Sequence, residues 1–159
     1  MDSRLLYRAA ILGGAVSALT DAVPLLNIVN CLCCLGIASG GIVAVLYLRS
    51  QGINRPFTMP EIFRIGLLTG IFGAFGAFLF HYLVFQMVGN WQIQWITNMI
   101  DHMAEVPPMW EDIYEKLQSP EFQGFAGWSI LIRSLIIFPV FTYGGALLTN
   151  QWLIKRNRG

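Results

Sequence analysis

Three cysteines near the start of the second apolar segment have the residue type and spacing for redox chemistry. The segment Cys31-Leu32-Cys33-Cys34 contains a C-x-x-C pair. At a helix N-terminus such a pair would lie close together, and the thiol pKa would be lowered there. The competing interpretation, which we favour, is that these cysteines are small side chains buried in a tightly packed helix. A zinc site made of the three cysteines and His81 would have an unusual ligand spacing, so we predict no bound metal.

Three ionisable residues interrupt the long apolar segments: Asp21, His81 and Arg133. Counted from the predicted helix ends, all three fall in the outer third of a membrane, where a charged side chain still needs a partner. Asp21 is the only carboxylate at that depth within the predicted helices, so we predict a structural Asp21–Arg133 ion pair that fixes the order of the helices. His81 continues a face of small residues, and we expect it to point into a helix contact as a polar core residue. The functional alternative at this place is a proton or anion site.

Other kinds of chemistry leave no pattern in the sequence. It contains no nucleotide-binding loop, catalytic triad or carboxylate pair, and Ser129 has no base at a recognisable spacing. The ten Lys and Arg residues are scattered over positions that flank the apolar segments, which argues against a nucleic-acid partner. We therefore predict no cofactor, and a quinone is required only if Cys31 and Cys34 are redox partners.

The elements that must position these residues are four long apolar segments. Hydrophobic residues make up 55% of the 159-residue chain and charged residues 12%, about half the charged fraction of a soluble domain. The stretch from Leu25 to Leu48 has no charge and is long enough to cross a bilayer as a helix. The pattern predicts an all-α, integral membrane four-helix bundle that forms one domain over residues 1–159. Its helices are expected at about 5–22, 28–49, 62–88 and 126–154, with Asn27 and Asn30 as N-cap candidates for the second and a kink at Pro139 in the fourth.

Basic residues predict the orientation of the chain. Those of the two ends and of the Gln51–Pro60 loop fall on one side, whereas the connection at about 89–125 carries six acidic residues and one basic residue. The positive-inside rule then places both termini and the loop in the cytoplasm and the connection outside, as in a multi-pass protein of the bacterial inner membrane. The basic residues on the cytoplasmic side are Arg4, Arg8, Arg49, Arg55, Arg64, Lys155, Arg156 and Arg158.

The outer connection has the pattern of one or two amphipathic helices. Apolar residues recur at helical spacing on either side of Pro107-Pro108, opposite acids and amides. Two short helices lying on the outer membrane face fit this pattern, and a soluble cap packed on the helix ends is the alternative. We expect tryptophans to anchor the chain at the membrane interfaces, namely Trp91, Trp95, Trp110, Trp128 and Trp152.

Small residues recur every four positions in the first three predicted helices. The packing glycines among them are Gly14, Gly36, Gly40, Gly66 and Gly70. Such seams let helix backbones approach closely in lipid, where no hydrophobic force drives helices together. We expect the seams to pack helices of this chain against one another. The alternative is that at least one seam binds another membrane protein or a second copy of the chain.

The arrangement resembles a group of uncharacterised bacterial inner-membrane proteins with four helices. The likeness rests on a Pro-Leu-Leu-Asn turn before a Cys-rich, Gly-Gly second segment (Pro24 to Gly41), on the Gly-rich segment after Phe63-Arg64-Ile65-Gly66, and on the acidic amphipathic stretch before the fourth helix. It covers nearly the whole chain, with loose motifs. The resemblance implies a four-helix membrane fold and no particular activity.

A second likeness, of topology, is to the quinone-linked thiol oxidases of the disulfide-bond formation B type. These proteins also have four helices, both termini inside, a C-x-x-C that opens the second helix, and a long outer connection with a horizontal helix. The resemblance implies that Cys31 and Cys34 are the quinone-proximal pair. Two features depart from it: the outer connection contains no cysteine for a relay pair, and Gly36 to Ser39 stand where an Arg would follow the pair.

The leading functional prediction is a non-enzymatic accessory subunit or scaffold of a larger membrane assembly. It would contact the lipid bilayer, bind a membrane-protein partner or a second copy through its small-residue seams, and bind a periplasmic surface through its Trp-rich connection. The alternatives are a quinone-linked thiol oxidoreductase using Cys31 and Cys34, and a small transporter that works as an oligomer. Few intramembrane polar residues and no duplicated half argue against the transporter.

Overall fold

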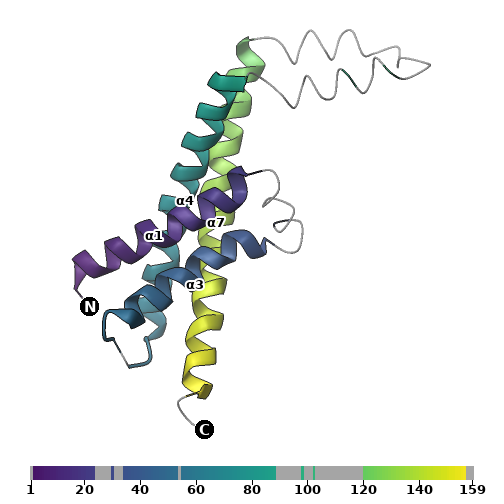
Figure 1. Ribbon diagram of the computed structural model, residues 1–159. Coiled ribbons are helices and arrows are strands. Elements are labelled where there is room, and N and C mark those ends of the chain that lie inside the picture. The colour runs from purple at the N-terminus through teal and green to yellow at the C-terminus, as the bar shows by residue number, and fades with distance from the viewer. Residues whose placement is uncertain are drawn as a thin grey trace.

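Four helices make up the regular structure of the residues that the computed structural model describes, which are 2–23, 30, 34–53, 55–88, 98, 102 and 120–156. They are α1 (Ser3–Ala22), α3 (Leu35–Ser50), α4 (Met59–Val88) and α7 (Pro120–Arg156) (Figure 1). No strand occurs in these residues, so the prediction of an all-α fold with four helices is confirmed for them. Two stretches, Met59–Leu83 of α4 and Leu131–Arg156 of α7, are long and apolar enough to cross a membrane.

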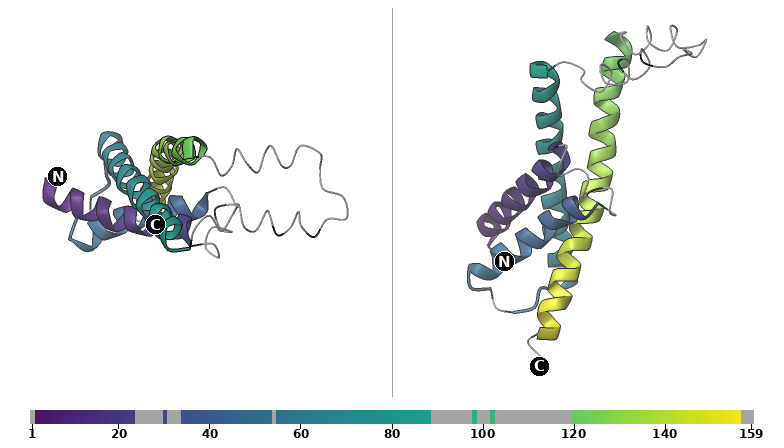
Figure 2. Two further views of the ribbon diagram at one scale, coloured as in Figure 1. Left: turned by 90° about the horizontal axis from the view of Figure 1, so that it is seen from above. Right: turned by 45° about the vertical axis from the view of Figure 1, so that its right-hand side comes forward.

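α4 and α7 are the two long helices, and they lie side by side (Figures 1 and 2). α1 and α3 cross them obliquely toward the end where α7 finishes, so α4 and α7 extend beyond them at the other end. α1 packs mainly on α3 and α4, whereas α3 packs mainly on α1 and α7. The start of α1, the end of α7 and the connection between α3 and α4 all lie toward the same end of the long helices.

The local sequence explains where three of the helices begin. Asp2 is the N-cap of α1, and its side chain accepts a hydrogen bond from the Arg4 N–H at 3.0 Å. Glu61 in the first turn of α4 reaches back to accept the Thr58 N–H at 3.0 Å. α7 begins at Pro120, which suits a first turn because its missing N–H would have no helical partner there. Both α4 and α7 therefore begin a few residues before the predicted 62 and 126.

α3 begins later than the helix predicted at about 28–49. Cys34, just before it, has φ 55° and ψ 31°, which is the left-handed region. A right-handed helix cannot continue through a residue in this conformation. The left-handed conformation costs a residue other than glycine about 1–2 kcal/mol. The N-cap of α3 is therefore Cys34 and not the predicted Asn30. The Asn30 side chain nevertheless pairs an amide of the first turn, because its Oδ1 accepts the Ile37 N–H at 3.1 Å. The other N-cap candidate, Asn27, lies outside the described residues.

Glycines bring α1 close to both of its neighbours. A Cβ at Gly40 of α3 would overlap Gly13 and Ser17 of α1, and a Cβ at Gly14 of α1 would overlap the backbone of Gly73 of α4. The close approach also lets Ser17 Oγ donate across the crossing to a carbonyl of α3 at 2.9 Å. These positions of the seams therefore pack helices of the same chain.

A second close crossing joins α4 to α7. A Cβ at Gly66 would overlap Tyr143, and a Cβ at Gly70 would overlap Pro139. Thr142 Oγ1 donates to the Gly66 carbonyl at 2.8 Å, so a hydrogen bond bridges the two helices where they touch. α7 runs as one helix through Pro139.

Apolar side chains fill the space on either side of these crossings. The first cluster lies toward the end with the α3–α4 connection and consists of Ala9, Ala44, Val45, Leu48, Phe57, Ile62, Ile65 and Ala146. The second consists of Ala18, Ile37, Ala74, Ala77 and Phe138, with Cys34 packed against it. Many members are alanines, because small side chains are what fits between helices that approach this closely.

Candidate functional site

A cluster of ionisable and polar side chains lies where α1 ends beside α4. Asp21, in the last turn of α1, is buried, with 11% of its side chain exposed. Its Oδ2 pairs with Nε2 of His81 on α4 at 3.3 Å, and its Oδ1 accepts a hydrogen bond from Asn30 Nδ2 at 3.3 Å. His81 is more open, with 36% of its side chain exposed. This Asp21–Asn30–His81 cluster joins α1, α4 and the chain that leads into α3.

Asn30 ties two helix ends together. Its Nδ2 also donates to the Thr20 carbonyl of α1 at 3.4 Å, while its Oδ1 accepts the Ile37 N–H of α3. The first N–H groups and the last carbonyl groups of a helix have no partner within the helix, and the Ile37 N–H and the Thr20 carbonyl are two such groups. A Cβ at Gly36 would overlap the Asn30 side chain. The predicted packing glycine at 36 therefore makes room for this amide, and a Cβ there would also come within 3.0 Å of the Thr20 side chain of α1.

The position of Asp21 explains why it needs partners. A carboxylate in the last turn of a helix meets the negative end of the helix dipole, which disfavours it by about 0.3–1 kcal/mol at an exposed site. Burial adds a desolvation cost unless the carboxylate oxygens are hydrogen-bonded. Asn30 donates to one oxygen, and His81 donates to the other when its Nε2 carries the ring proton.

Arg133 does not join the cluster. The Asp21 carboxylate pairs with His81, and the Arg133 side chain is exposed on α7. Distances from the helix ends predict a common depth for Asp21, His81 and Arg133. They do not determine which helices are neighbours in the bundle. Because α1 packs mainly on α3 and α4, the side chain that reaches Asp21 comes from α4.

The other predicted site residues divide between described and undescribed parts of the chain. Trp128 and Trp152 are exposed on α7, and the Arg156 guanidinium lies 5.6 Å from the centroid of the Trp152 ring. Cys34 is half-buried and precedes α3. Residues outside the described ranges are Cys31, Cys33, Trp91, Trp95 and Trp110, with most of the predicted amphipathic connection. The Cys31–Cys34 pair therefore stays a prediction.

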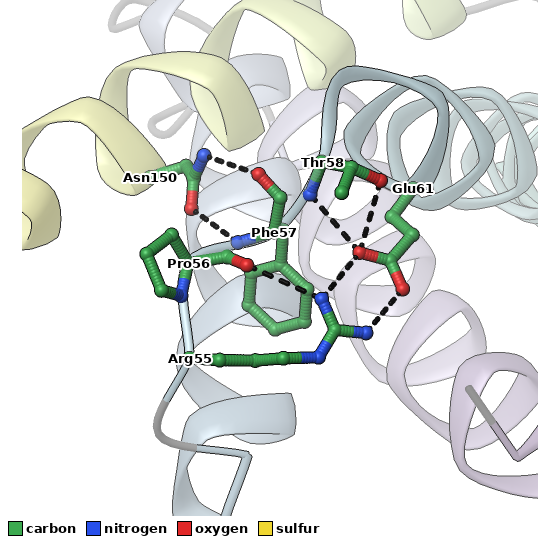
Figure 3. Close-up of polar contacts among 6 residues, drawn as sticks. All are labelled: Arg55, Pro56, Phe57, Thr58, Glu61 and Asn150. Carbon is green, nitrogen blue, oxygen red and sulfur yellow. Dashed lines mark hydrogen bonds and ion pairs between the residues drawn. The ribbon is translucent and has the colours of Figure 1, made fainter.

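Asn150, which no sequence motif singles out, fixes the connection between α3 and α4 to α7 (Figure 3). Its Oδ1 accepts the Phe57 N–H and its Nδ2 donates to the Phe57 carbonyl, each at 3.1 Å, and both residues are buried. One side chain thereby pairs both backbone groups of a loop residue 93 positions away. No local pattern in the sequence could signal such a contact.

Arg55 and Glu61 hold the same connection from the other side (Figure 3). Two guanidinium nitrogens of Arg55 donate to the two carboxylate oxygens of Glu61 at 2.8 and 2.5 Å, and this hydrogen bonding raises the pKa of Arg55. Glu61 also accepts hydrogen bonds from the N–H and hydroxyl of Thr58. The sequence signal was available, because Thr-x-x-Glu before an apolar run is typical of a capping box.

A double-mutant cycle should distinguish the observed partner of Asp21 from the predicted one. Asp21→Asn and His81→Leu are expected to be non-additive by about 1 kcal/mol, because they share one contact. Asp21→Asn and Arg133→Leu are expected to add within about 0.5 kcal/mol, because the structure keeps them apart. Chemical denaturation of the purified protein in mild detergent measures both cycles. A coupling with Arg133 as large as that with His81 would contradict the arrangement described above.

The chemistry open to the Asp21–Asn30–His81 cluster is to hold and exchange a proton. A carboxylate faces an imidazole at hydrogen-bond distance, and the tautomer of the ring decides which atom carries the proton. Within the described ranges, no three or more His, Cys, Asp or Glu side chains are grouped so as to hold a metal ion. Comparison of the chain with protein-family models, curated proteins and solved structures gives no match.

Proposed function

We propose that this protein is a non-enzymatic accessory subunit or scaffold that crosses a bacterial inner membrane several times. The observation that carries the proposal is the apolar outward surface of α4 and α7. Its exposed large hydrophobic side chains are Met59, Phe63, Phe72, Phe75, Leu79, Phe80, Tyr82, Leu83, Trp128, Ile132, Ile136, Val140, Leu148 and Trp152. So many exposed large apolar side chains on two neighbouring helices are unusual in water, whereas lipid tails or a partner helix would cover them.

The inward polar side chains support a structural role. Ser17 and Thr142 donate to carbonyls of neighbouring helices, Asn30 pairs backbone groups at two helix ends, and Asn150 pairs both backbone groups of the loop residue Phe57. In a bilayer these groups have no water to bond with, so side chains of the same chain must satisfy them. These four side chains therefore cross-link helices.

Two tryptophans support placing α7 across the bilayer. Trp128 and Trp152 are 68% and 55% exposed. The helix between them is about 36 Å long at 1.5 Å per residue, which lies between the hydrocarbon thickness and the full thickness of a bilayer. Tryptophans gather at the two interfaces of membranes. The basic ends of the chain and the α3–α4 connection then lie on the cytoplasmic side by the positive-inside rule.

The surface that would bind a partner helix lies on α7. A Cβ at Gly144 would meet nothing within 4 Å, unlike the glycines at the crossings. Val140 and Leu148, one turn to either side, are 60% and 66% exposed. A glycine between exposed apolar residues lets another helix approach closely. The open space at Gly144 supports a partner surface on α7, whereas Gly14, Gly36, Gly40, Gly66 and Gly70 contact other parts of the same chain.

Gly144→Leu tests the proposal. The wild type and the variant are purified in mild detergent, and the proteins that accompany them are quantified by mass spectrometry. We expect at least one membrane protein to fall by about tenfold, which corresponds to about 1.4 kcal/mol of lost binding. The free energy of unfolding of the chain itself should not fall, because the added side chain points into open space. Recovery of the same proteins with both chains would contradict a partner at this surface.

A further inference from the structure

Arg133 is a cation on an apolar surface. It lies near the start of the apolar stretch Leu131–Arg156. Its neighbours Ile132 and Ile136 are 57% and 63% exposed, and Arg133 is exposed with them. A charged side chain at the centre of a transmembrane helix costs about 2.5–3.5 kcal/mol on insertion scales, and the cost falls toward the interface. An arginine on this surface therefore needs an oxyanion.

The acids of the described residues do not supply one. Asp21, the carboxylate predicted at this depth, is buried and hydrogen-bonded to the other two members of its cluster. Asp2 and Glu61 lie at the starts of α1 and α4, toward the opposite end of the molecule. Glu121 precedes Arg133 on α7 by about 18 Å of helix. The oxyanion must come from elsewhere.

The depth of Arg133 points to the headgroup region. Trp128, which is 68% exposed, precedes it on α7 by about 7–8 Å of helix and marks the interface in the proposed placement. A long arginine side chain covers such a distance by extending along the helix surface toward the interface. The phosphates of phospholipids lie in this headgroup region and are oxyanions that any phospholipid bilayer supplies there. Because the guanidinium presents parallel N–H donors, it matches two oxygens of one phosphate.

We propose that Arg133 binds the phosphate of a phospholipid in the outer leaflet, with Trp128 at the same interface. The inference rests on the proposed placement of α7 across the membrane. The ligand class is a phosphodiester lipid, and the site consists of the exposed guanidinium above the apolar surface of Ile132 and Ile136. This lipid contact would anchor α7 at the interface. It replaces the predicted ion pair with Asp21 as the role of Arg133.

Solid-state NMR of the full chain in vesicles of phosphatidylethanolamine and phosphatidylglycerol tests the site. With ¹³C at the guanidinium carbons and no phosphate in the buffer, lipid ³¹P should dephase an arginine signal that disappears in Arg133→Gln. Gln151→Ala, an exposed position at the other end of α7, should retain that signal. Flotation of the vesicles reports separately whether the protein enters the membrane at all.

The outcomes separate the two proposals. A protein that does not float with the vesicles overturns the membrane placement and the lipid site with it. A protein that floats but shows the same dephased signals in Arg133→Gln overturns the lipid site alone. A short distance from the Arg133 guanidinium to a ¹³C carboxylate would assign its counter-ion to an acidic side chain and would likewise overturn it. A last arm uses the protein in phosphate-free detergent micelles with added inorganic phosphate. If the Arg133 signal is dephased there as strongly as in the vesicles, the ligand is a free phosphate ion and the lipid site is overturned.

Discussion

Replacing Gly70 with Leu is expected to lower the free energy of unfolding by about 3 kcal/mol, at the upper end of the usual cost of overpacking. Even a Cβ at this position would overlap the backbone of Pro139 and come within 2.8 Å of the Phe138 carbonyl carbon. A backbone cannot rotate aside as a side chain can, so α4 and α7 must move apart. The hydrogen bond from Thr142 to α4 would then lengthen or break. Chemical denaturation of the purified protein in mild detergent measures the loss.

Gly144→Leu is the matched control, because it makes the same change in a long helix where a Cβ would meet nothing within 4 Å. Its expected loss of stability is no more than about 0.5 kcal/mol, as for other surface substitutions. Removing a glycine from a helix interior can itself stabilise the helix by about 1 kcal/mol, so a small gain is also consistent. Similar losses at Gly70 and Gly144 would mean that the α4–α7 contact does not run through Gly70.

The contrast between the two glycines shows what the sequence could and could not predict. Spacing of four identifies small residues on one helix face, and the structure places Gly66 and Gly70 where two backbones meet. The same spacing cannot tell which helix a seam faces, because that depends on contacts between distant segments. Gly144 stands in the same kind of apolar helix and faces open space, and nothing in its neighbourhood in the sequence distinguishes it.

For the Asp21–Asn30–His81 cluster too, the sequence predicts depth along each helix but not which helices are neighbours. The depth of Asp21 and His81 can be counted along each helix at 1.5 Å per residue, and the structure brings the two side chains together at 3.3 Å. The predicted ion pair between Arg133 and Asp21 rests on charge and depth alone. Which helix lies beside α1 is a tertiary property, and α1 packs mainly on α3 and α4.

Helix ends divide into those with a local signal and those without. Asp2 and Glu61 bond to backbone groups within three residues, so a capping pattern could have placed the starts of α1 and α4. Cys34 adopts a left-handed conformation that its residue type does not favour, and the apolar run around it predicts a continuous helix. Cys34 packs against the cluster that includes Ala18 and Phe138, and such contacts between distant segments cannot be read from a local pattern.

Replacing Asn150 with Ala is expected to cost about 3 kcal/mol of unfolding free energy. The change removes two hydrogen bonds and leaves the N–H and carbonyl of Phe57 without their partner in a residue that is only 4% exposed. An unsatisfied buried polar group costs about 1–3 kcal/mol. The connection between α3 and α4 would come away from α7, so hydrogen exchange of the Phe57 amide should accelerate strongly. Gln151→Ala, at the exposed neighbouring position, should change stability by no more than about 0.5 kcal/mol.

Asn150→Asp separates the two hydrogen bonds from the volume of the side chain. An ionised carboxylate can still accept the Phe57 N–H, but its second oxygen would face the Phe57 carbonyl with no proton between them. A protonated carboxyl has an O–H that can donate to that carbonyl, as the amide does. The variant should therefore be less stable than the wild type at neutral pH, and the difference should shrink as the pH falls through the range in which the new carboxyl takes up its proton, ordinarily near pH 4. Denaturation of both proteins across this pH range measures the difference. A stability gap that stays constant with pH would mean that the Phe57 carbonyl does not depend on a donor at position 150.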